Sequence, residues 1–412
     1  MNKQVLLSII FFLMVTGCNE IKQVANQRDY LHQAIIDETI EIETKDLSLS
    51  KQDLANFAKK LKDVRIVALG EQTHGAGSVF TLKTQLIEYL HNYHDFDVLI
   101  LESGMYDVEE IWQQAKKGQR IKDIAPGNIF YMYSKTDEVT PLFDYINAQA
   151  STKKPLRLVG FDSQHTGGIS NKNLIGALTK AVSNSADNWI NDKAWPLFTS
   201  QLQRVLNVDN TRLSPEEEKR FFKQIDQLKT TFSANQKHAF WYRITRGLEA
   251  QAKRQWQISD ARSQEMGENI KYWAEKYPDK KMIVWAHSFH LMNQGLGQIN
   301  AGQVAKEAFG KDYYMIHFTG ASGDFLNFIN MENTKVATPS NNSFEKLLND
   351  NISSNIAFND IRSLKQHNVT IKDKTTSVFA NNYQQTVDIE QWTGFWDGLF
   401  FIKEIKPAHF KE

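Results

Sequence analysis

The sequence is poor in cysteine, and its opposite charges balance. Cys18 is the single cysteine among 412 residues, which excludes a disulfide within the chain and a multi-cysteine metal site. The 48 lysines and arginines equal the 48 aspartates and glutamates, and no long basic run occurs, so nothing in the charge favours a nucleic-acid partner. Neither a low-complexity tract nor an internal repeat is present, and a chain of this length can bury a large core.

Several motifs of well-known hydrolases are also missing. A Gly-x-Ser-x-Gly nucleophile elbow is absent, which argues against serine acyl-enzyme chemistry of the α/β-hydrolase kind. His-Glu-x-x-His and a Walker-type phosphate loop are absent too, which argues against zincins and nucleotidases. Hydrolysis by this chain would therefore depend on other side chains.

The N-terminus holds the one cysteine. Residues 1–3 form a short basic start, residues 5–15 are an apolar stretch too short to span a bilayer comfortably, and residues 15–18 read Val-Thr-Gly-Cys. This arrangement resembles the lipobox of a bacterial lipoprotein signal; the alternative is a short anchor helix with an incidental cysteine. We predict a signal peptide over residues 1–18 that ends at a lipidated Cys18, a tether over residues 19–30, and one domain over residues 31–412. A lipid on Cys18 would exclude a cysteine nucleophile and would anchor the protein to a membrane of the bacterial cell envelope.

Apolar runs typical of buried strands alternate with amphipathic stretches along this domain. Such runs occupy residues 65–69, 98–101, 156–161, 282–286 and 313–318. Helices are predicted over residues 50–61, where Ser50 can cap, and over residues 79–91. Residues 319–323 are small and predict a turn, while residues 395–402 predict a last buried segment. The alternation predicts an α/β fold with a mainly parallel central sheet flanked by helices.

The stretch from about residue 170 to 278 predicts an inserted all-helical subdomain. The residues from Ser214 to Glu217 form a helix start, with a capping serine, proline at the first helical position and glutamate at the third. Apolar stripes then recur at helical spacing, and we interpret their aromatic members as packing residues. We expect this subdomain to lie over the ligand crevice as a lid or a specificity wall.

Acidic residues and histidines recur where the predicted strands end. In chain order these are Glu71 and His74, then Glu102, then Asp162, then His287 and His290. Each alone has an ordinary interpretation as a helix cap, a loop residue or a structural histidine. In open parallel sheets, however, ligands bind outside the carboxyl ends of the strands, so the recurrence predicts one shared crevice.

An imidazole flanked by carboxylates supports direct hydrolysis by general base catalysis. A neutral histidine can take a proton from water, while a carboxylate beside it holds its tautomer and stabilises the imidazolium that forms. A second histidine and a cation would stabilise the oxyanion or protonate the leaving group. His287 and His290 can supply the histidine, and Lys83 or Arg262 the cation.

At these residues the chain resembles the erythromycin esterase family. The resemblance rests on an ordered set: Gly70-Glu71-x-x-His74, Lys83, Glu102, Gly160-x-Asp162, Arg262-x-x-x-Met266-x-x-Asn269 and Ala286-His287-x-x-His290. It implies a carboxylic ester hydrolase that opens an ester or lactone, in some members a macrolide lactone, which confers antibiotic resistance. It also implies that His74 is the general base, that Glu71 and Glu102 orient it, and that His287 is a second catalytic histidine.

The resemblance further implies roles in substrate binding for Lys83, His290, Arg262 and Asp162. The family often has arginine where this chain has Lys83, and a lysine is a point charge without the bidentate geometry of a guanidinium. No cofactor is expected, although a divalent metal at the Glu and His cluster is an alternative. The expected partner is a small-molecule ester or lactone; the sequence gives no oligomeric state.

Two other functions stay open on the sequence. One is a haem- or metal-binding lipoprotein of the envelope, because glutamate and histidine are good metal ligands. The other is an accessory protein of envelope polysaccharide metabolism with a degenerate site. The sequence names no substrate, because specificity would lie in loops and in the helical insertion.

Overall fold

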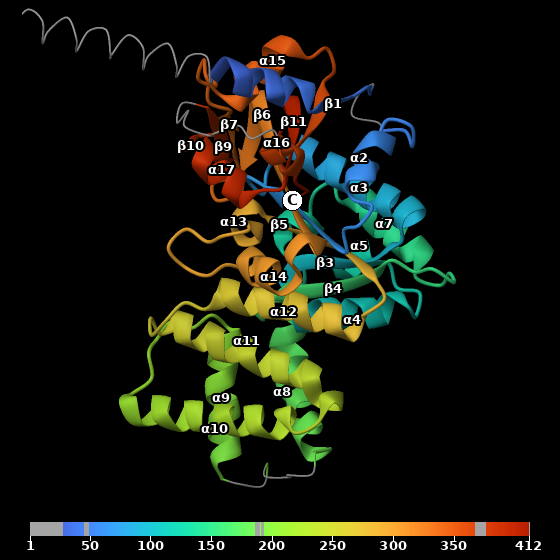
Figure 1. Ribbon diagram of the computed structural model, residues 1–412. Coiled ribbons are helices and arrows are strands. Elements are labelled where there is room, and N and C mark those ends of the chain that lie inside the picture. The colour runs from blue at the N-terminus through green and yellow to red at the C-terminus, as the bar shows by residue number, and fades with distance from the viewer. Residues whose placement is uncertain (1–27, 45–48, 186–189, 191–192, 367–375, 412) are drawn as a thin grey trace, which may run out of the picture.

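The computed structural model describes residues 28–44, 49–185, 190, 193–366 and 376–411 (Figure 1). The predicted signal peptide, Cys18 and residues 19–27 of the predicted tether lie outside these ranges. Within them, no helix combines the length and the apolar composition that are needed to cross a bilayer.

A nine-stranded sheet forms the centre of the molecule, and most of its strands are parallel. The parallel strands lie in the spatial order β4 (Arg157–Asp162), β3 (Phe96–Gly104), β5 (Lys281–His287), β2 (Ile66–Glu71), β6 (Tyr313–Asn327) and β11 (Gly398–Ile405). Three further strands form antiparallel pairs: β8 (Ile356–Asp360) with β11, β1 (Thr39–Ile42) with β8, and β7 (Glu332–Lys335) with β6. The predicted α/β fold with a mainly parallel sheet is confirmed.

Helices cover both faces of this sheet. One face packs against α2 (Ala55–Lys60), α3 (Gly77–His94), α4 (Met105–Ala115), α5 (Ile121–Ile124) and α7 (Thr140–Gln149). The other packs against α12 (Arg262–Lys276), α14 (Ala301–Phe309), α15 (Phe344–Asn351) and α17 (Ile389–Phe395). Short helices α6 (Tyr131–Ser134), α13 (Ser288–Leu291) and α16 (Ile361–Gln366) and a hairpin of β9 (Ser377–Asn381) and β10 (Gln385–Asp388) complete the domain.

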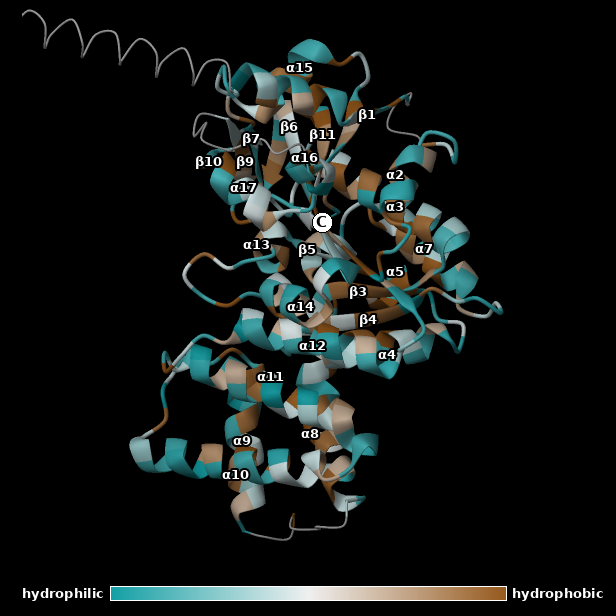
Figure 2. Ribbon diagram, viewed as in Figure 1, coloured by the Kyte–Doolittle hydropathy of each residue, from teal (hydrophilic) through white to brown (hydrophobic). Residues whose placement is uncertain are grey.

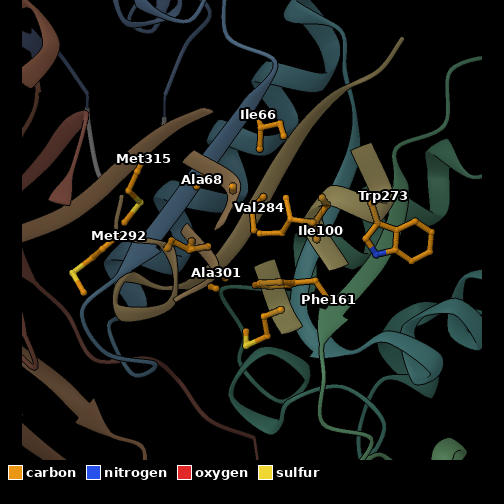
Figure 3. Packing of buried hydrophobic residues seen from close by; sticks show 14 of the residues in the cluster. Ile66, Ala68, Ile100, Phe161, Trp273, Val284, Met292, Ala301 and Met315 are labelled. Atoms are coloured by element: carbon orange, nitrogen blue, oxygen red, sulfur yellow. The ribbon is translucent and has the colours of Figure 1, made fainter. Parts of the chain in front are cut away.

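Alternate side chains of the central strand β2 enter the two opposite cores. Ile66 and Ala68 belong to one apolar cluster, Val67 and Leu69 belong to the other, and none of the four has exposed surface. Figure 3 shows the first cluster, and Figure 2 shows β3 and β4 as brown, apolar strands. Full burial of an aliphatic side chain contributes about 1.5–3 kcal/mol, so these strands are held firmly on both faces. Their carboxyl ends are thereby fixed in place.

The described residues between β4 and β5 form five α-helices and a short 3₁₀ helix at Gln236–His238. The α-helices are α8 (Gly168–Ser183), α9 (Ala194–Leu206), α10 (Pro215–Ser233), α11 (Ala239–Gln255) and α12. Ser214 caps α10 and forms a capping box with Glu217, as its sequence predicts. Figure 1 shows α8 to α11 extending away from the sheet below α12.

Two local predictions differ from the structure. The helix predicted from Ser50 begins only at Ala55, and residues 51–54 form turns, although Ser50 and Asp53 exchange the hydrogen bonds of a capping box. The turn predicted at residues 319–323 is instead part of β6, since β11 lies parallel to it and pairs with it as far as Gly323. The predicted last buried segment supplies that strand, and residues 398–402 are fully buried in it.

Candidate active site

The parallel register brings the chemistry-bearing strand ends together. Glu71 at the end of β2 is paired with His287 at the end of β5. On the other side of β5, β3 carries Glu102, and β4 beside it ends at Asp162. The crevice expected from the sequence is a cavity of about 790 Å³ at this edge, and its lining includes His74, Glu102, Asp162 and His287.

Glu71 has no exposed surface, and its carboxylate accepts from three side chains. Oε1 accepts from His74 Nδ1 at 3.2 Å and from the Tyr133 hydroxyl at 2.8 Å, while Oε2 accepts from the Lys83 ammonium. Burial opposes ionisation, but the charge of Lys83 and the hydrogen bonds outweigh it and hold the pKa of Glu71 well below its usual range. Glu71 is therefore a fixed anion behind His74.

His74 lies in the loop that links β2 to α3, with one ring nitrogen facing inward. Glu71 occupies Nδ1, which leaves Nε2 as the nitrogen that can act on a bound molecule. The rings of Phe130 and Phe328 pack edge-on against it, with centroids 4.7 and 5.0 Å away. Gly75 permits the loop to pass here, because a Cβ atom would lie 1.6 Å from the carbonyl oxygen of Leu326.

Lys83 faces Glu71 rather than the cavity, and its predicted contact with substrate is corrected. The side chain has no exposed surface and does not line the cavity. Burial lowers the pKa of Lys83 to about 8, although the neighbouring Glu71 and Glu102 favour its charged form. Lys83 thus stabilises the anion that orients His74.

Tyr133 of α6 also belongs to this network, and no sequence motif predicted its role. Its hydroxyl lies 2.8 Å from Glu71 Oε1 and 3.3 Å from Glu102 Oε2. Burial and the two carboxylates raise the pKa of Tyr133 well above 10, so it remains a donor. It lies in a segment without a strand end, and only tertiary packing shows its position.

Glu102 and His287 form the next layer of the site. Glu102 Oε2 accepts from the backbone N–H of His287 at 2.7 Å. His287 Nε2 donates to the carbonyl oxygen of Gln72 at 2.7 Å, and its Nδ1 accepts from the N–H of Phe289 at 3.1 Å. Burial, then the nearby His74, lower the pKa of His287 to about 4. His287 is therefore a neutral ring whose two nitrogens are both occupied, and its catalytic role stays a prediction.

Arg262 and Asp162 form a bidentate ion pair at the cavity wall. Arg262 Nε and Nη2 donate to Asp162 at 3.0 and 2.7 Å, and Nη2 lies 3.7 Å from Glu102 Oε1. His290 donates or accepts at 2.5 Å with the Ser263 hydroxyl, and its Nε2 lies 3.5 Å from the same Glu102 oxygen. Burial, then the charge of Arg262, lower the pKa of His290 to about 3. Asp162 is thus paired with Arg262, and Arg262 is a cationic residue of the described cavity lining.

Other parts of the cavity wall come from segments that the sequence did not indicate. They include residues 127–131, Phe328 after β6, residues 380–381 and 385–387 of the β9–β10 hairpin, and Phe395 of α17. Of helices α8 to α12, the cavity lining includes Arg262 alone. The prediction that the helical subdomain covers the crevice is therefore wrong, because helices α8 to α11 pack on one another, on α4 and on α12 and contribute no residue to the cavity lining.

Among the described residues, Glu71, His74 and Glu102 form a cluster that could hold a metal ion. Their ligand atoms lie within 4.8 Å of one another. The Lys83 ammonium already contacts one oxygen of Glu71, and the Tyr133 hydroxyl contacts the other. A divalent ion would compete with a buried ammonium for the same carboxylate, so this donor set fits the cation that the chain itself supplies.

The chain is similar to proteins of known sequence and structure over most of its length. It is 27% identical over 406 residues to the Bacillus subtilis (strain 168) protein named "Putative hydrolase YbfO", covering 87% of this chain and 88% of that protein. Its fold matches a protein from Bacillus cereus (TM-score 0.74, 21% identity, 93% and 99% of the two chains covered). It also matches a succinoglycan biosynthesis protein (TM-score 0.74, 18% identity, 93% and 99% covered).

A third similar structure is a mutant of the erythromycin esterase EreC in its open conformation, with a TM-score of 0.65, 16% identity, and 91% and 98% of the two chains covered. The family model described as "Erythromycin esterase" matches residues 91–393. That range includes Glu102, Arg262 and His287 and begins after His74. The match extends over well more than half of the sequence, and the chain belongs to the erythromycin esterase family.

Proposed function

We propose that this protein hydrolyses a carboxylic ester or lactone, with His74 as the general base that activates water. Family membership and the hydrolase name of the Bacillus subtilis relative support hydrolase activity. The observation that carries the finer proposal is the chain of contacts from Lys83 through Glu71 to His74 Nδ1 at the wall of the cavity. It leaves Nε2 of His74 free of Glu71 and beside the space that a substrate would fill.

The proposed reaction consists of attack by water on the acyl carbon followed by release of the alcohol. Nε2 of His74 takes a proton from water as the oxygen attacks the acyl carbon, and Glu71 stabilises the imidazolium through Nδ1–H. The tetrahedral oxyanion then collapses, the acyl–oxygen bond breaks, and the alkoxide takes the proton from Nε2. Arg262 is the cavity cation that can stabilise the oxyanion. No side chain becomes acylated in this scheme.

The origin of the incorporated oxygen tests this scheme directly. In a single turnover in H₂¹⁸O with enzyme in excess, we expect the carboxylate product to carry one ¹⁸O atom. An acyl-enzyme anhydride on Glu71 or Glu102 that water opens at the enzyme's own carboxyl carbon would instead deliver an unlabelled enzyme oxygen during the first turnover, and that result would overturn direct attack by water.

We propose macrolide lactones as the first substrates to test. The cavity is within the range that encloses drug-sized ligands, and Phe130, Phe289, Phe328 and Phe395 give it apolar walls. Because one similar structure is named a succinoglycan biosynthesis protein, acylated sugars belong in the same panel. A gain of one water in mass identifies a lactone substrate, and release of the free acid identifies an acylated sugar.

We also propose that the protein is anchored to the bacterial envelope through a lipid on Cys18. The apolar run before it and its being the one cysteine in the chain support this. Feeding cells an alkyne fatty acid should label the wild type and leave Cys18→Ser unlabelled. Equal labelling of both would overturn the proposal.

A further inference from the structure

The buried hydroxyl of Tyr133 stands between the two carboxylates of the site. It lies 2.8 Å from Glu71 Oε1, 3.3 Å from Glu102 Oε2 and 3.5 Å from His74 Nδ1. A phenol has one hydrogen, so it makes one strong bond at a time, and the shorter distance assigns it to Glu71. Rotation about the C–O bond would turn the same hydrogen to Glu102.

We propose that Tyr133 is a positioning residue that sets the basicity of the His74–Glu71 pair and couples it to Glu102. This inference rests on the proposed function, since His74 is taken as the base. Glu71 Oε1 accepts hydrogen bonds from both the Tyr133 hydroxyl and His74 Nδ1–H, so the two donors share the negative charge of one oxygen atom. The Tyr133 bond therefore weakens the hold of Glu71 on a protonated His74, which helps the imidazolium to return its proton to the leaving group.

The surroundings of Tyr133 fix it for this task. The side chain has no exposed surface, and its ring packs edge-on against Trp285 with centroids 5.5 Å apart and at 5.7 Å from Phe80. It is not part of the cavity lining, so it reaches a substrate only through Glu71, Glu102 and His74. A change at its hydroxyl should alter turnover and leave substrate binding unchanged.

Replacement of the hydroxyl by hydrogen isolates this effect. In Tyr133→Phe we expect kcat to fall roughly 10- to 100-fold, the loss expected for one hydrogen bond to a charged group, with KM unchanged. The acid limb of the pH–rate profile should move to higher pH, because Glu71 then holds a protonated His74 more tightly. An unmoved acid limb, or an effect on KM alone, would overturn the proposal.

Tyr383→Phe is the matched control. Tyr383 is equally buried, and its hydroxyl makes no hydrogen bond among the described residues. We expect its kcat, KM and pH profile to equal those of the wild type. If Tyr133→Phe does not fold, 3-fluorotyrosine in place of Tyr133 keeps the ring and donates more strongly, so the acid limb should move to lower pH. An unmoved limb in that protein would equally overturn the proposal.

A measurement without substrate separates this inference from the proposed function. Histidine labelled with ¹³C can be titrated by NMR in the full chain, with the His74 signal assigned by its loss in His74→Ala. We expect its midpoint to lie at higher pH in Tyr133→Phe than in the wild type and in Tyr383→Phe. If the wild type turns over no ester or lactone, the proposed function fails, and this titration still decides the role of Tyr133.

Discussion

Lys83 and Glu71 form an ion pair without exposed surface, and each side chain depends on the other. Removing one partner leaves an unpaired buried charge, which costs about 3–5 kcal/mol. We therefore expect Lys83→Met to lower the free energy of unfolding by an amount of that order, and Glu71→Gln combined with Lys83→Met to recover a large part of it. Urea unfolding of both variants measures the difference. Equal stability of the single and the double variant would contradict the pairing.

The same pair gives the stability a definite dependence on pH. The pKa of Glu71 in the folded chain lies below its ordinary value of 4.5, so the pair contributes stability above that pH and loses it as the pH falls. The advantage of the wild type over the double variant should shrink on acidification. This behaviour follows from the direction of the pKa shift alone.

The residues of the site were predictable to different degrees. Glu71, His74, Glu102 and His287 were predictable because each follows an apolar run, and parallel strands place such positions at one edge. The orientation of Lys83 toward Glu71 was not predictable, because the position of a residue on a helix face does not show whether its side chain meets a carboxylate or a cavity. Tyr133 was not predictable at all, because its position depends on packing against Phe80 and Trp285.

Capping boxes begin two helices that lie in different parts of the molecule, α10 and α17. Ser214 caps α10 in the helical insertion, and Asp388 caps α17, which carries Phe395 into the cavity wall. Loss of either cap costs about 1 kcal/mol. We expect Ser214→Ala and Asp388→Ala to lower stability similarly, while Asp388→Ala alone raises KM. An equal change of KM in both variants would show that the helical insertion also shapes the cavity.

Glu345 at the start of α15 is a second buried carboxyl with consequences for stability. Oε1 accepts from the Thr319 hydroxyl of β6 at 2.6 Å and from the N–H of Phe379 of β9 at 2.9 Å. Burial raises the pKa of Glu345 to about 7, so its contribution is fully present below pH 4.5 and is lost as the pH rises through 7. Relative to Glu345→Gln, the wild type should lose up to about 3 kcal/mol between pH 5 and pH 9. Thermal unfolding at both pH values measures this, and parallel curves for the two proteins would contradict it.

The elements themselves were predictable where the pattern is local. Ser214 signals the start of α10 through contacts within one turn, and the apolar runs mark their strands. The turn expected at residues 319–323 failed because β11, about eighty residues later in the chain, pairs with that stretch and extends β6. The helix predicted from Ser50 begins four residues after its first expected helical position, although Ser50 and Asp53 form the local contacts of a capping box, so a correct local signal did not fix where the helix starts.

At the scale of the whole molecule, the helical insertion and the cavity are separate. Helices α8 to α11 extend away from the sheet (Figure 1) and pack on one another, on α4 and on α12, while the cavity lies at the carboxyl edge of the sheet. Amphipathic stripes predicted the helices, but such stripes contain no information about where a subdomain packs relative to the sheet. The expected lid was wrong for that reason.

The ammonium of Lys83 beside Glu71 predicts that the protein does not depend on a bound metal ion. Because Lys83 already neutralises Glu71, we expect prolonged dialysis against a chelator to leave hydrolysis and stability unchanged. Turnover at matched protein concentration before and after dialysis measures this. Loss of activity that added Zn²⁺ or Mn²⁺ restores would show that Glu71, His74 and Glu102 hold a metal instead.

The proposed function requires His74 to activate water for attack on an ester or lactone held in the cavity. Its most direct test is the hydrolysis of a panel of macrolide lactones and acylated sugars by the full chain in detergent, with His74→Ala as the comparison and circular dichroism confirming that both fold. With the wild type we predict a lactone product heavier by one water, or an acylated sugar cleaved into the free acid and the sugar alcohol, and with His74→Ala a rate lower by about 10²- to 10⁴-fold. Turnover that survives His74→Ala, or a panel that the wild type leaves intact, would contradict the account.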